Sequence, residues 1–441
     1  MLETGHSSWQ NPCFMDCFEV EGGRALEGSV KASGSKNASL PLMAASLLLE
    51  GTAHFTPVPD LRDIDTMKLL LAELGMELDK SGDTLAVTMV DGTKTEASYD
   101  IVRRMRASIS VLGPLLARRG QARVPLPGGC VFGLRPVDLH VRGMRALGAT
   151  VEQENGCLVA TAPSTGLLGA SMDLRSPFGS TVLGTINVMS AAVLAKGESV
   201  IHSAAQEPEV VEVARYLRAC GAILEGEGTA SIRIQGVEAL HATPWELPAD
   251  RIEAGTLLLA GAITGGRVRV TRCRPQELTS LAAALERTGL QSSSGDDWME
   301  VDARHGKLEN IQLETGPYPG FPTDLQAQWL ALATQMKGNG RMRERIYPER
   351  FMHVPELERL GAKLLRSGDT VQIQGGTALT AAPVLASDLR ASACLVLAGL
   401  VADGITTVRR VYHLDRGYVA LESKLQQLGG KVQRCEDVEK P

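Results

Sequence analysis

The sequence lacks the features that mark two large classes of protein. Acidic residues outnumber basic ones by 51 to 45, and the resulting net charge of −6 gives no support to nucleic-acid binding. No run of about 18 apolar residues occurs, which excludes a membrane-spanning helix. The polar stretch Met1–Pro12 does not resemble a signal peptide. We therefore expect a cytoplasmic protein with neither a nucleic-acid nor a membrane partner.

Motifs for nucleotides and metals are also missing. Gly34-Ser35-Lys36 lacks the earlier glycine and the following Ser or Thr of a P-loop, and no G-x-G-x-x-G opens a helix after a strand. Cys13 and Cys17 form a C-x3-C pair, but no second pair follows at zinc spacing. The eight cysteines lie mostly far apart, which is typical of a reduced intracellular protein. We expect no metal and no cofactor.

The chain contains an internal repeat. Its 441 residues are too many for one small core, so two domains are expected. A helix pattern that ends at a glycine and precedes a strand pattern recurs six times, with 68 to 73 residues between successive glycines. These glycines are Gly75, Gly148, Gly221, Gly289, Gly361 and Gly429. Glycine suits this position because it tolerates the left-handed conformation that closes many helices.

Each repeat has the same content. An apolar helix is followed by a β-branched strand such as Ser199–Ile201 or Thr406–Val408, then by an amphipathic helix and short alternating strands such as Thr370–Ile373. The apolar helices are predicted over Leu40–Leu49, Ser108–Ala117, Gly184–Ala195, Ala254–Ile263, Asp324–Thr334 and Leu389–Val401. They are apolar on most faces and should be buried. The sequence predicts an α/β fold, specifically a two-domain inside-out α/β barrel with three repeats per domain and helices inside small sheets.

The domain boundaries follow from the repeats. The Pro-rich segment 243–248 separates the third repeat from the fourth, so we place one crossing there and a second near Gly34. The first strand, Phe18–Val20, is expected to pair with the C-terminal end. One predicted domain comprises residues 1–35 plus 249–441, with three repeats and both termini. The other comprises residues 36–248, with three repeats and the loop around Cys130. A single solenoid is the alternative, but repeats this long favour closed domains.

Polar residues stand at the start of the apolar helix in every repeat. They are Lys36 and Asn37, Arg106 and Ser108, Gly179 to Thr181, Asp250 and Arg251, Thr323 and Asp324, and Asp388 and Arg390. Helix N-termini carry unpaired N–H groups and a positive partial charge, so a cleft shared by them would suit anions. Capping or ion pairing is the commoner role for any one of these residues. Their recurrence in all six repeats favours a binding site.

One loop carries a reactive group. In segment 125–140, three glycines and three prolines surround Cys130, and this composition excludes a helix or a central strand. We interpret the segment as a mobile loop that carries a thiol, followed by Arg135, which could hold an anion. An ordinary surface turn with an incidental cysteine is the alternative.

Several blocks between about Phe18 and Val432 resemble a known family. They are Gly34-Ser35-Lys36-Asn37-Ala38, Met105-Arg106-Ala107-Ser108-Ile109, Leu126-Pro127-Gly128-Gly129-Cys130, Arg135-Pro136-Val137-Asp138-Leu139-His140, Glu207-Pro208-Glu209, Asp250-Arg251-Ile252-Glu253, Phe321 to Gln328, Arg350 to Val354, Asp388 to Ser392 and Asp415-Arg416-Gly417-Tyr418. They are similar to the UDP-N-acetylglucosamine 1-carboxyvinyltransferase family of enolpyruvyl transferases, which opens peptidoglycan synthesis. The family fold, two domains of three repeats with helices inside sheets, agrees with the repeat count.

The resemblance implies transfer of the enolpyruvyl group from phosphoenolpyruvate to the 3′-hydroxyl of UDP-N-acetylglucosamine, with release of phosphate. It assigns Cys130 as the thiol that protonates the methylene carbon and can form an adduct, and Asp324 as the base. The implied catalytic residues are Cys130, Asp324, Lys36 and Arg416. The implied substrate-binding residues are Lys36, Asn37, Arg106, Arg135, Pro136, Val137, Asp138, Leu139, Arg175, Ser176, Pro177, Phe178, Gly179, Asp324, Ile346, Arg350, Arg390 and Arg416.

The residue types suit that chemistry. Addition of an alcohol to an enol carbon needs a base for the hydroxyl and an acid for the carbon, and a carboxylate and a thiol can divide these roles. Fixed arginines can neutralise the anionic substrates. A nearby Arg135 would favour the thiolate of Cys130, which helps adduct formation and opposes proton donation. The balance between these two roles stays open.

The sequence departs from the family where the nucleotide should bind. The usual Lys-x-Ser-x-Gly loop is Arg175-Ser176-Pro177-Phe178-Gly179, a common tryptophan is Ser110, and the stretch before Arg350 reads Tyr347-Pro348-Glu349. An enolpyruvyl transferase for another acceptor, such as a uridine nucleotide, is therefore an alternative. A non-catalytic paralogue that binds a nucleotide sugar is a second one, although Cys130, Asp324 and Arg416 are all retained.

Overall fold

The computed structural model describes residues 15–126 and 137–437. Within them, one helix of each repeat is buried over most of its length. These six helices are α1 (Lys36–Ala45), α4 (Leu112–Arg119), α6 (Val182–Ala192), α8 (Arg251–Ile263), α10 (Gln326–Gln335) and α12 (Leu389–Gly399). Each lies within about four residues of a helix predicted from the sequence. Their low polarity explains their burial, because a helix that is apolar all round gains most when no face meets water.

The second helix of each repeat is amphipathic. These helices are α2 (Arg62–Glu73), α5 (Asp138–Ala146), α7 (Pro208–Ala219), α9 (Thr279–Arg287), α11 (Val354–Arg359) and α13 (Leu421–Gln427), with a short extra helix, α3 (Tyr99–Val102). The glycine that follows each of the six adopts a positive φ, between 81° at Gly75 and 109° at Gly221. The repeat glycines therefore take the left-handed conformation predicted for them.

Most strands form small sheets with a similar order of strands. The strands of the first three repeats are β3 (Leu49–Glu50), β4 (Thr52–Thr56), β5 (Met76–Ser81), β6 (Thr84–Met89), β7 (Gln121–Pro125), β8 (Thr150–Glu154), β9 (Cys157–Thr161), β10 (Ser171–Asp173), β11 (Glu198–His202), β12 (Ile223–Glu225), β13 (Ser231–Gln235), β14 (Leu240–His241) and β15 (Trp245–Glu246). They form the sheets β15-β4-β6-β5, β7-β9-β8 and β10-β11-β13-β12, and the pair β14-β3.

The remaining strands repeat this plan. They are β1 (Met15–Glu21), β2 (Glu27–Lys31), β16 (Arg267–Thr271), β17 (Ser292–Ser294), β18 (Trp298–Asp302), β19 (Gln312–Glu314), β20 (Asn339–Arg343), β21 (Lys363–Ser367), β22 (Thr370–Gln374), β23 (Val384–Leu385), β24 (Ile405–Arg409) and β25 (Lys431–Asp437). Their sheets are β17-β18-β16-β2, β19-β20-β22-β21 and β23-β24-β1-β25. Each four-stranded sheet in the described segments has one parallel edge strand and otherwise antiparallel pairing.

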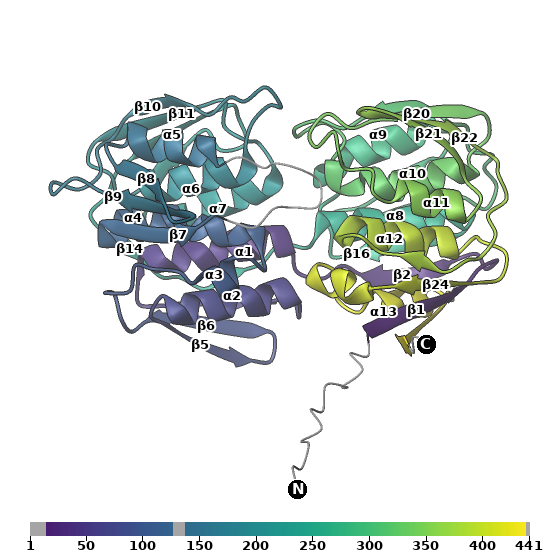
Figure 1. Ribbon diagram of the computed structural model, residues 1–441, viewed down its shortest axis with the longest axis horizontal. Helices are drawn as coiled ribbons and strands as arrows, with labels where there is room; N and C mark the ends of the chain where they lie inside the picture. Colours follow the sequence, from purple (N-terminus) through teal and green to yellow (C-terminus); the bar gives the residue numbers. More distant parts are fainter. Residues whose placement is uncertain (1–14, 127–136, 438–441) are drawn as a thin grey trace, which may run out of the picture.

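The N-terminal strands complete the last lobe. β1 lies between β24 and β25, with Val20 opposite Val432, so the predicted pairing of the first strand with the C-terminal end is confirmed. β2 pairs in parallel with β16. Figure 1 shows both purple strands inside the lobe that is otherwise green and yellow.

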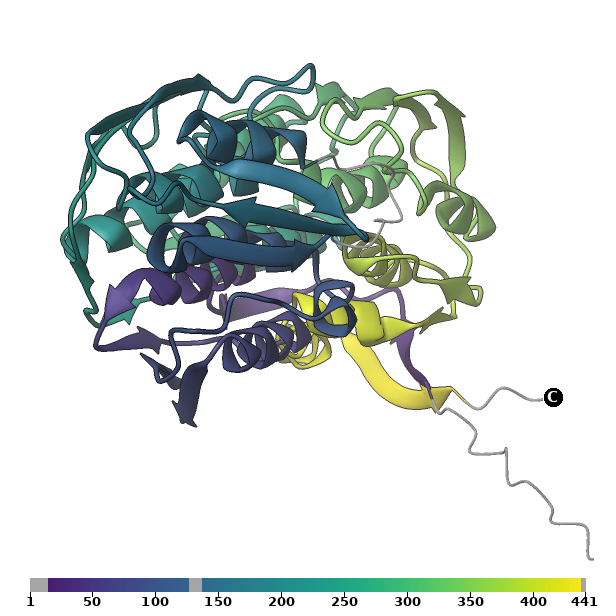
Figure 2. The ribbon, with the colours of Figure 1, turned by 60° about the vertical axis from the view of Figure 1, so that its left-hand side comes forward.

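Buried apolar side chains form two separate clusters, one from residues between 38 and 247 and one from residues between 18 and 32 and between 252 and 432. The two chain crossings run side by side, because Gly34 forms an antiparallel bridge with Ala249. Figures 1 and 2 show the resulting two lobes from two directions. The mixed α/β content and the repeated small sheets agree with the sequence prediction, while the domain boundaries themselves stay a prediction.

Charged side chains join the two lobes near the crossings. Arg251 donates to both carboxylate oxygens of Glu209, at 2.9 and 3.1 Å, and Arg274 donates to Glu212 at 3.0 Å. The backbone N–H of Tyr318 donates to Glu207 at 3.3 Å. We call Glu207, Glu209, Glu212, Glu277, Arg251 and Arg274 the Glu209 cluster. Among the helices of residues 15–126 and 137–437, none combines the length with the hydropathy that a membrane span requires.

Candidate active site

Asp324 is the centre of a buried polar cluster between the lobes. It lies in a short 3-10 helix, Thr323–Leu325, which begins after Pro322 and leads into α10. Its Oδ1 accepts a hydrogen bond from Arg350 at 2.8 Å, and its Oδ2 accepts one from Arg390 at 2.9 Å. Asn37 of the opposite lobe donates its amide N–H to Oδ2 at 3.3 Å. Residues from three repeats thus meet at one carboxylate.

The charges around Asp324 control its ionisation. Burial alone opposes the charged form, but Arg390, Arg350 and Lys36 outweigh it and hold the pKa of Asp324 well below its ordinary value. Arg390 and Arg350 are only 2% and 6% exposed, so little water screens the pairs. Asp324 is therefore an ionised hydrogen-bond acceptor, and as it stands a weak base.

A second layer of hydrogen bonds fixes Arg390. The hydroxyl of Tyr418 accepts from Arg390 at 3.0 Å and from Gln328 at 3.0 Å, and lies 2.9 Å from the hydroxyl of Thr256. Gln328 also donates to the backbone carbonyl of Asp324 at 3.0 Å. All of these groups are buried. The network links α8, α10 and α12, so the guanidinium and the carboxylate are oriented by the helices that carry them.

Lys36 and Arg416 meet a second carboxylate from the first lobe. Arg416 donates from Nε to Asp63 at 2.9 Å, and Lys36 Nζ lies 3.8 Å from the same carboxylate. Burial lowers the pKa of Lys36, while the charge of Asp63 partly opposes this. We call Lys36, Asp63, Asp324, Arg350, Arg390 and Arg416 the Asp324 cluster. It holds four basic groups against two acidic ones.

Not every polar residue at a helix start faces an anion site. Asp250 accepts from the N–H groups of Ile252 and Glu253, Asp388 accepts from its own helix in the same way, and Thr181 accepts from Gly184. These three side chains cap α8, α12 and α6. Capping, the commoner role considered for any one of these residues, is thus observed for these three, and a shared cleft stays a prediction.

The nucleotide-side candidates Arg106, Val137, Asp138 and Leu139 lie where a 3-10 helix (Arg106–Val111) meets α5. Burial lowers the pKa of His140 in α5 to about 3, and the positive charge of Arg106 adds to the shift. Asn187 fixes this meeting point by donating to Ile109 at 2.7 Å and by lying 3.0 Å from His140 Nδ1.

The loop Arg175–Gly179 reaches the other lobe. Ser176 donates its hydroxyl to the carbonyl of Gly179 at 2.8 Å, which closes the turn around Pro177. Gly179 has φ +101°, and a Cβ there would lie 2.7 Å from Pro317. Only glycine suits this position, for backbone and contact reasons together. Phe178 is 56% exposed, and Arg175 donates to Ser203 at 3.3 Å.

The backbone N–H of Ile346 is already used, since it donates to Glu344 at 2.8 Å. Glu344 is fully buried and also accepts from Thr315 and Thr323, and Thr323 in turn accepts from Arg350. Glu344 therefore supports the Asp324 cluster from behind. No sequence signal distinguished it, whereas Tyr418 stood within a block already matched to the family.

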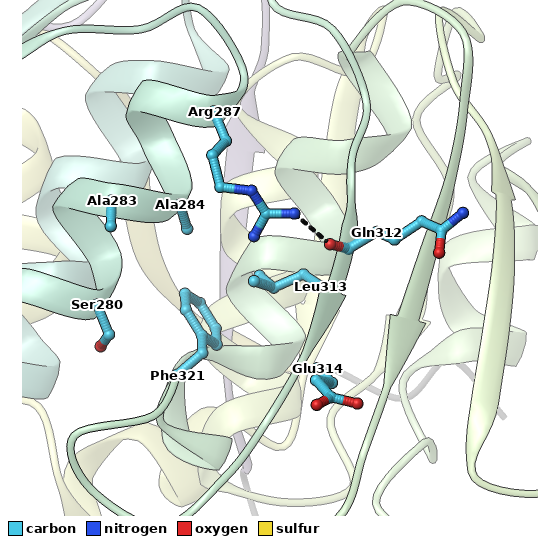
Figure 3. A pocket seen from close by; sticks show the side chains of 8 residues that line it. All are labelled: Ser280, Ala283, Ala284, Arg287, Gln312, Leu313, Glu314 and Phe321. Atoms are coloured by element: carbon cyan, nitrogen blue, oxygen red, sulfur yellow. Dashed lines mark hydrogen bonds between the residues drawn. The ribbon is translucent and has the colours of Figure 1, made fainter.

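Cys130, Arg135 and Pro136 lie outside the described residues. Of the other candidates, Lys36, Asn37, Asp324, Arg350, Arg390 and Arg416 converge on the Asp324 cluster. A separate hollow of about 420 Å³ lies between α9 and β19 (Figure 3). Arg287 crosses it to donate to the carbonyl of Gln312 at 2.7 Å. None of the predicted site residues that the structure describes lines this hollow.

Comparisons with known proteins cover nearly the whole chain. The family model for EPSP synthase (3-phosphoshikimate 1-carboxyvinyltransferase) matches residues 20–425. The UDP-N-acetylglucosamine 1-carboxyvinyltransferase of Nitratidesulfovibrio vulgaris is 48% identical over 95% of this chain and 99% of its own. The protein of the same name from Dichelobacter nodosus is 46% identical over 96% of this chain and all of its own.

Solved structures share the fold. The enolpyruvyl transferase NikO from Streptomyces tendae superposes with a TM-score of 0.85 at 24% identity, over 96% of this chain and 99% of that one. EPSP synthase from Acinetobacter baumannii superposes with a TM-score of 0.73 at 18% identity, over 95% of this chain and 99% of that one. At these identities the likeness concerns the fold alone.

Proposed function

The chain belongs to the EPSP synthase family, and we propose that it transfers the enolpyruvyl group of phosphoenolpyruvate to the 3′-hydroxyl of UDP-N-acetylglucosamine, with release of phosphate. This reaction opens peptidoglycan synthesis. The identity of 48% to a relative of that activity, across 95% of the chain, supports the choice of both substrates.

One observation in the site carries the proposal. Four basic side chains at the lobe junction, of which Arg350 and Arg390 are buried and Lys36 and Arg416 partly so, pair with two carboxylates. An excess of buried positive charge is costly unless an anion arrives to balance it. Phosphoenolpyruvate brings a phosphate and a carboxylate, and Lys36, Arg390 and Arg416 can receive them. Arg135 would join them from the loop that follows Cys130.

In this proposal Asp324 receives the proton of the attacking hydroxyl. Its low pKa makes it a weak base while it is the carboxylate bonded directly to Arg350 and Arg390. An anionic substrate bound beside these arginines would raise the pKa of Asp324, which is the direction a base requires. Asn37 then acts as a neutral donor that orients the carboxylate without adding charge.

The remaining steps need an acid. As the 3′-oxygen bonds to C2 of phosphoenolpyruvate, its proton passes to Asp324 and the methylene carbon gains a proton from the thiol of Cys130. Loss of phosphate, with loss of a proton from the new methyl group, restores the double bond in the product. A glycine-rich loop such as the one around Cys130 can close over the substrates and exclude water.

The proposed architecture is the inside-out α/β barrel, with domains at residues 36–248 and at 1–35 plus 249–441. Two features support it. The buried apolar side chains fall into two clusters, and the segments at Gly34 and Ala249 run side by side. In this arrangement both substrates bind where the lobes meet, and the Arg106 and Arg175–Gly179 regions face the nucleotide.

The test is phosphate release from phosphoenolpyruvate with three acceptors in parallel: UDP-N-acetylglucosamine, UMP and shikimate 3-phosphate. Release with the nucleotide sugar alone is expected. Release with UMP instead would contradict the proposed acceptor and would assign the altered Arg175–Gly179 loop to acceptor choice. Release with none of the three would contradict the activity itself.

The role of Cys130 has its own test. An epoxide analogue of phosphoenolpyruvate, such as fosfomycin, should alkylate this thiol and stop turnover. Cys130→Asp should retain some activity, because a carboxylic acid can still donate a proton, and should resist alkylation. A mass increase on any other cysteine, or on none, would refute the assignment.

A further inference from the structure

Two cysteines from opposite ends of the sequence face each other across paired strands. Cys17 of β1 stands directly opposite Cys435 of β25 in the antiparallel register. Their sulfur atoms are 3.1 Å apart, and no disulfide bond joins them. The Cys435 sulfur also lies 3.7 Å from the carbonyl oxygen of Cys17. The positions are 418 residues apart in sequence, so only the closing of this sheet brings them together.

The geometry is close to that of a disulfide. Directly opposed residues of antiparallel strands have Cα atoms about 4.5 to 5.5 Å apart, within the range that a disulfide spans. A sulfur–sulfur bond is about 2.0 Å long, so the two sulfurs need to approach by about 1 Å. Side-chain rotation can supply this distance. The register that holds the pair extends over the whole of β1, from Met15 to Glu21.

Access to the pair is one-sided. Cys17 is 4% exposed, whereas Cys435 is partly exposed on β25, the edge strand of its sheet. Cys273 and Cys394 are buried, and burial raises the pKa of the Cys273 thiol to about 11. Reagents should therefore meet Cys435 before these thiols. Cys157 is also partly exposed, but no cysteine faces it among the described residues.

We propose that Cys17 and Cys435 form a modification site for small-molecule disulfides, whose product is an intramolecular disulfide between β1 and β25. The Cys435 thiolate attacks one sulfur of the reagent, and the first half of the reagent leaves as a thiol. Cys17 then attacks the Cys435 sulfur of the mixed disulfide, and the second half leaves as a thiol. The two protein thiols are oxidised, their protons pass to the leaving thiolates, and one reagent disulfide is reduced.

The bond would fasten a strand that supports the candidate active site. Arg434, next to Cys435, donates to Asp415 at 2.6 and 3.1 Å, and Asp415 precedes Arg416. Arg434 also pairs with Asp16 on β1 and with Glu422 on α13. Because β25 is an edge strand, it has one neighbour and can detach more easily than an inner strand. The disulfide would prevent that detachment and constrain nearly the whole chain in its unfolded state.

The experiment treats the full chain with oxidised glutathione and maps the cysteine peptides by mass spectrometry. The expected product is one peptide pair that joins Cys17 to Cys435, with the intact protein lighter by two hydrogen atoms. Its midpoint of thermal unfolding should rise by several degrees, and a reductant should reverse the rise. An adduct on Cys130, the thiol assigned above to the reaction, would appear as a separate mass increase on its own peptide, so the Cys17–Cys435 peptide pair, and not phosphate release, reports the bond.

Variants separate this outcome from incidental oxidation. Cys17→Ser should stop at a glutathione adduct on Cys435, and Cys435→Ser should give no cross-link. Cys157→Ser, the matched control, should behave as the unaltered protein does. Equal thermal unfolding of the reduced proteins verifies that the variants fold. A stable glutathione adduct on Cys435 of the unaltered chain, a bond from either cysteine to Cys13, or no bond at all would overturn the proposal.

Discussion

Two partly buried charge clusters at the lobe junction differ in the sign of the charge that predominates among their members. The Asp324 cluster has four basic groups and two carboxylates, while the Glu209 cluster has four carboxylates and two arginines. In the Glu209 cluster, burial raises the pKa values of Glu207 and Glu277, so protonation can relieve the excess. Arginines have no such escape, because they do not lose their protons.

We propose that this difference separates a structural contact, the Glu209 cluster, from a binding site, the Asp324 cluster. The Glu209 cluster can become neutral with protons from water, and it joins the lobes without any ligand. The Asp324 cluster can lower its excess only through Lys36, whose pKa burial lowers, or through a bound anion. Asp250 and Asp388, which cap α8 and α12, add negative charge near Arg390 and Arg350. Lys36 and Arg416 share the single carboxylate of Asp63, and we propose that an anionic substrate binds beside them.

Removal of the central carboxylate should have the largest effect. Asp324→Asn keeps the shape but leaves Arg350 and Arg390 without their negative partner. Phosphate release should fall by about 10³-fold, because the base is lost. Unfolding should become easier by about 3 kcal/mol, as expected when one partner of a buried ion pair is removed. Steady-state kinetics and denaturant unfolding measure the two losses.

Asp369→Asn is the matched control, since Asp369 pairs with Arg343 on the exposed surface. It should change neither quantity appreciably. If Asp324→Asn instead retained near-normal turnover, the only role of Asp324 would be to position Arg350 and Arg390. The two clusters would then differ only in charge.

Lys36 should give the next largest effect. Lys36→Arg keeps a positive charge but replaces a compact ammonium by a planar group, so turnover should fall by about 10²-fold. The pH profile should change as well. Burial lowers the pKa of Lys36 from 10.5, so its charge is lost at lower pH than in an ordinary lysine, and kcat/KM should decline on the alkaline side. In the arginine variant that decline should move to higher pH.

Lys36 also affects the free energy of unfolding, which should rise with pH where the activity falls. Between its lowered pKa and 10.5, the unfolded chain holds more protons than the folded one, so stability should rise with pH in that window. The arginine variant should not show this rise. An unchanged alkaline decline in its activity would assign the decline to a different group.

Tyr418→Phe should have a moderate effect. The change deletes the hydroxyl that accepts from Arg390 and Gln328 but keeps the ring. Turnover should fall by about tenfold, and stability by about 1 to 3 kcal/mol, because buried donors lose their acceptor. Tyr412→Phe, in the adjacent 3-10 helix, is the control. A stability loss without any change in kcat would make Tyr418 a purely structural residue.

Local patterns in the sequence predicted the repeats, because residues that are neighbours in the chain determine where each helix ends and where each strand lies. Gly75 and its five counterparts close helices, and the β-branched run at Thr406–Val408 lies within β24. Pairing between residues that are far apart in the sequence could not be predicted from such local patterns. Asp63 is one acid in the first turn of an amphipathic helix, and only the lobe junction brings it to Arg416, 353 positions later. Glu344 had no local signal at all.

The family resemblance predicted Asn37, Asp324, Arg350 and Arg390 as site residues, and they lie together, but it did not predict the ionisation state of Asp324. That state depends on three surrounding cations and on exclusion of water, which are properties of the folded lobe junction. Likewise, the caps formed by Asp250 and Asp388 depend on where a helix begins. Their polarity alone did not distinguish a cap from a ligand.

The smallest effect on activity and stability should come from the Glu209 cluster. Glu207→Gln tests whether protonation relieves the excess negative charge of this cluster. Oε1 of Glu207 accepts from the Tyr318 N–H, while Oε2 meets no hydrogen-bond partner among the described residues. Glutamine keeps the first oxygen and removes the ionisable group. The variant should be more stable by up to about 1 kcal/mol at neutral pH. Activity should be nearly unchanged, because the Asp324 cluster is untouched.

The pH dependence gives this last prediction its sign. Burial raises the pKa of Glu207, so above 4.5 and up to the raised pKa the folded chain holds more protons than the unfolded one. Stability therefore falls as pH rises through that window, and Glu207→Gln should flatten the fall. Glu358→Gln on the exposed surface of α11 is the control and should leave the curve unchanged. If Glu207→Gln were instead destabilising at neutral pH, its negative charge would be required by Arg251, and the Glu209 cluster would depend on full ionisation.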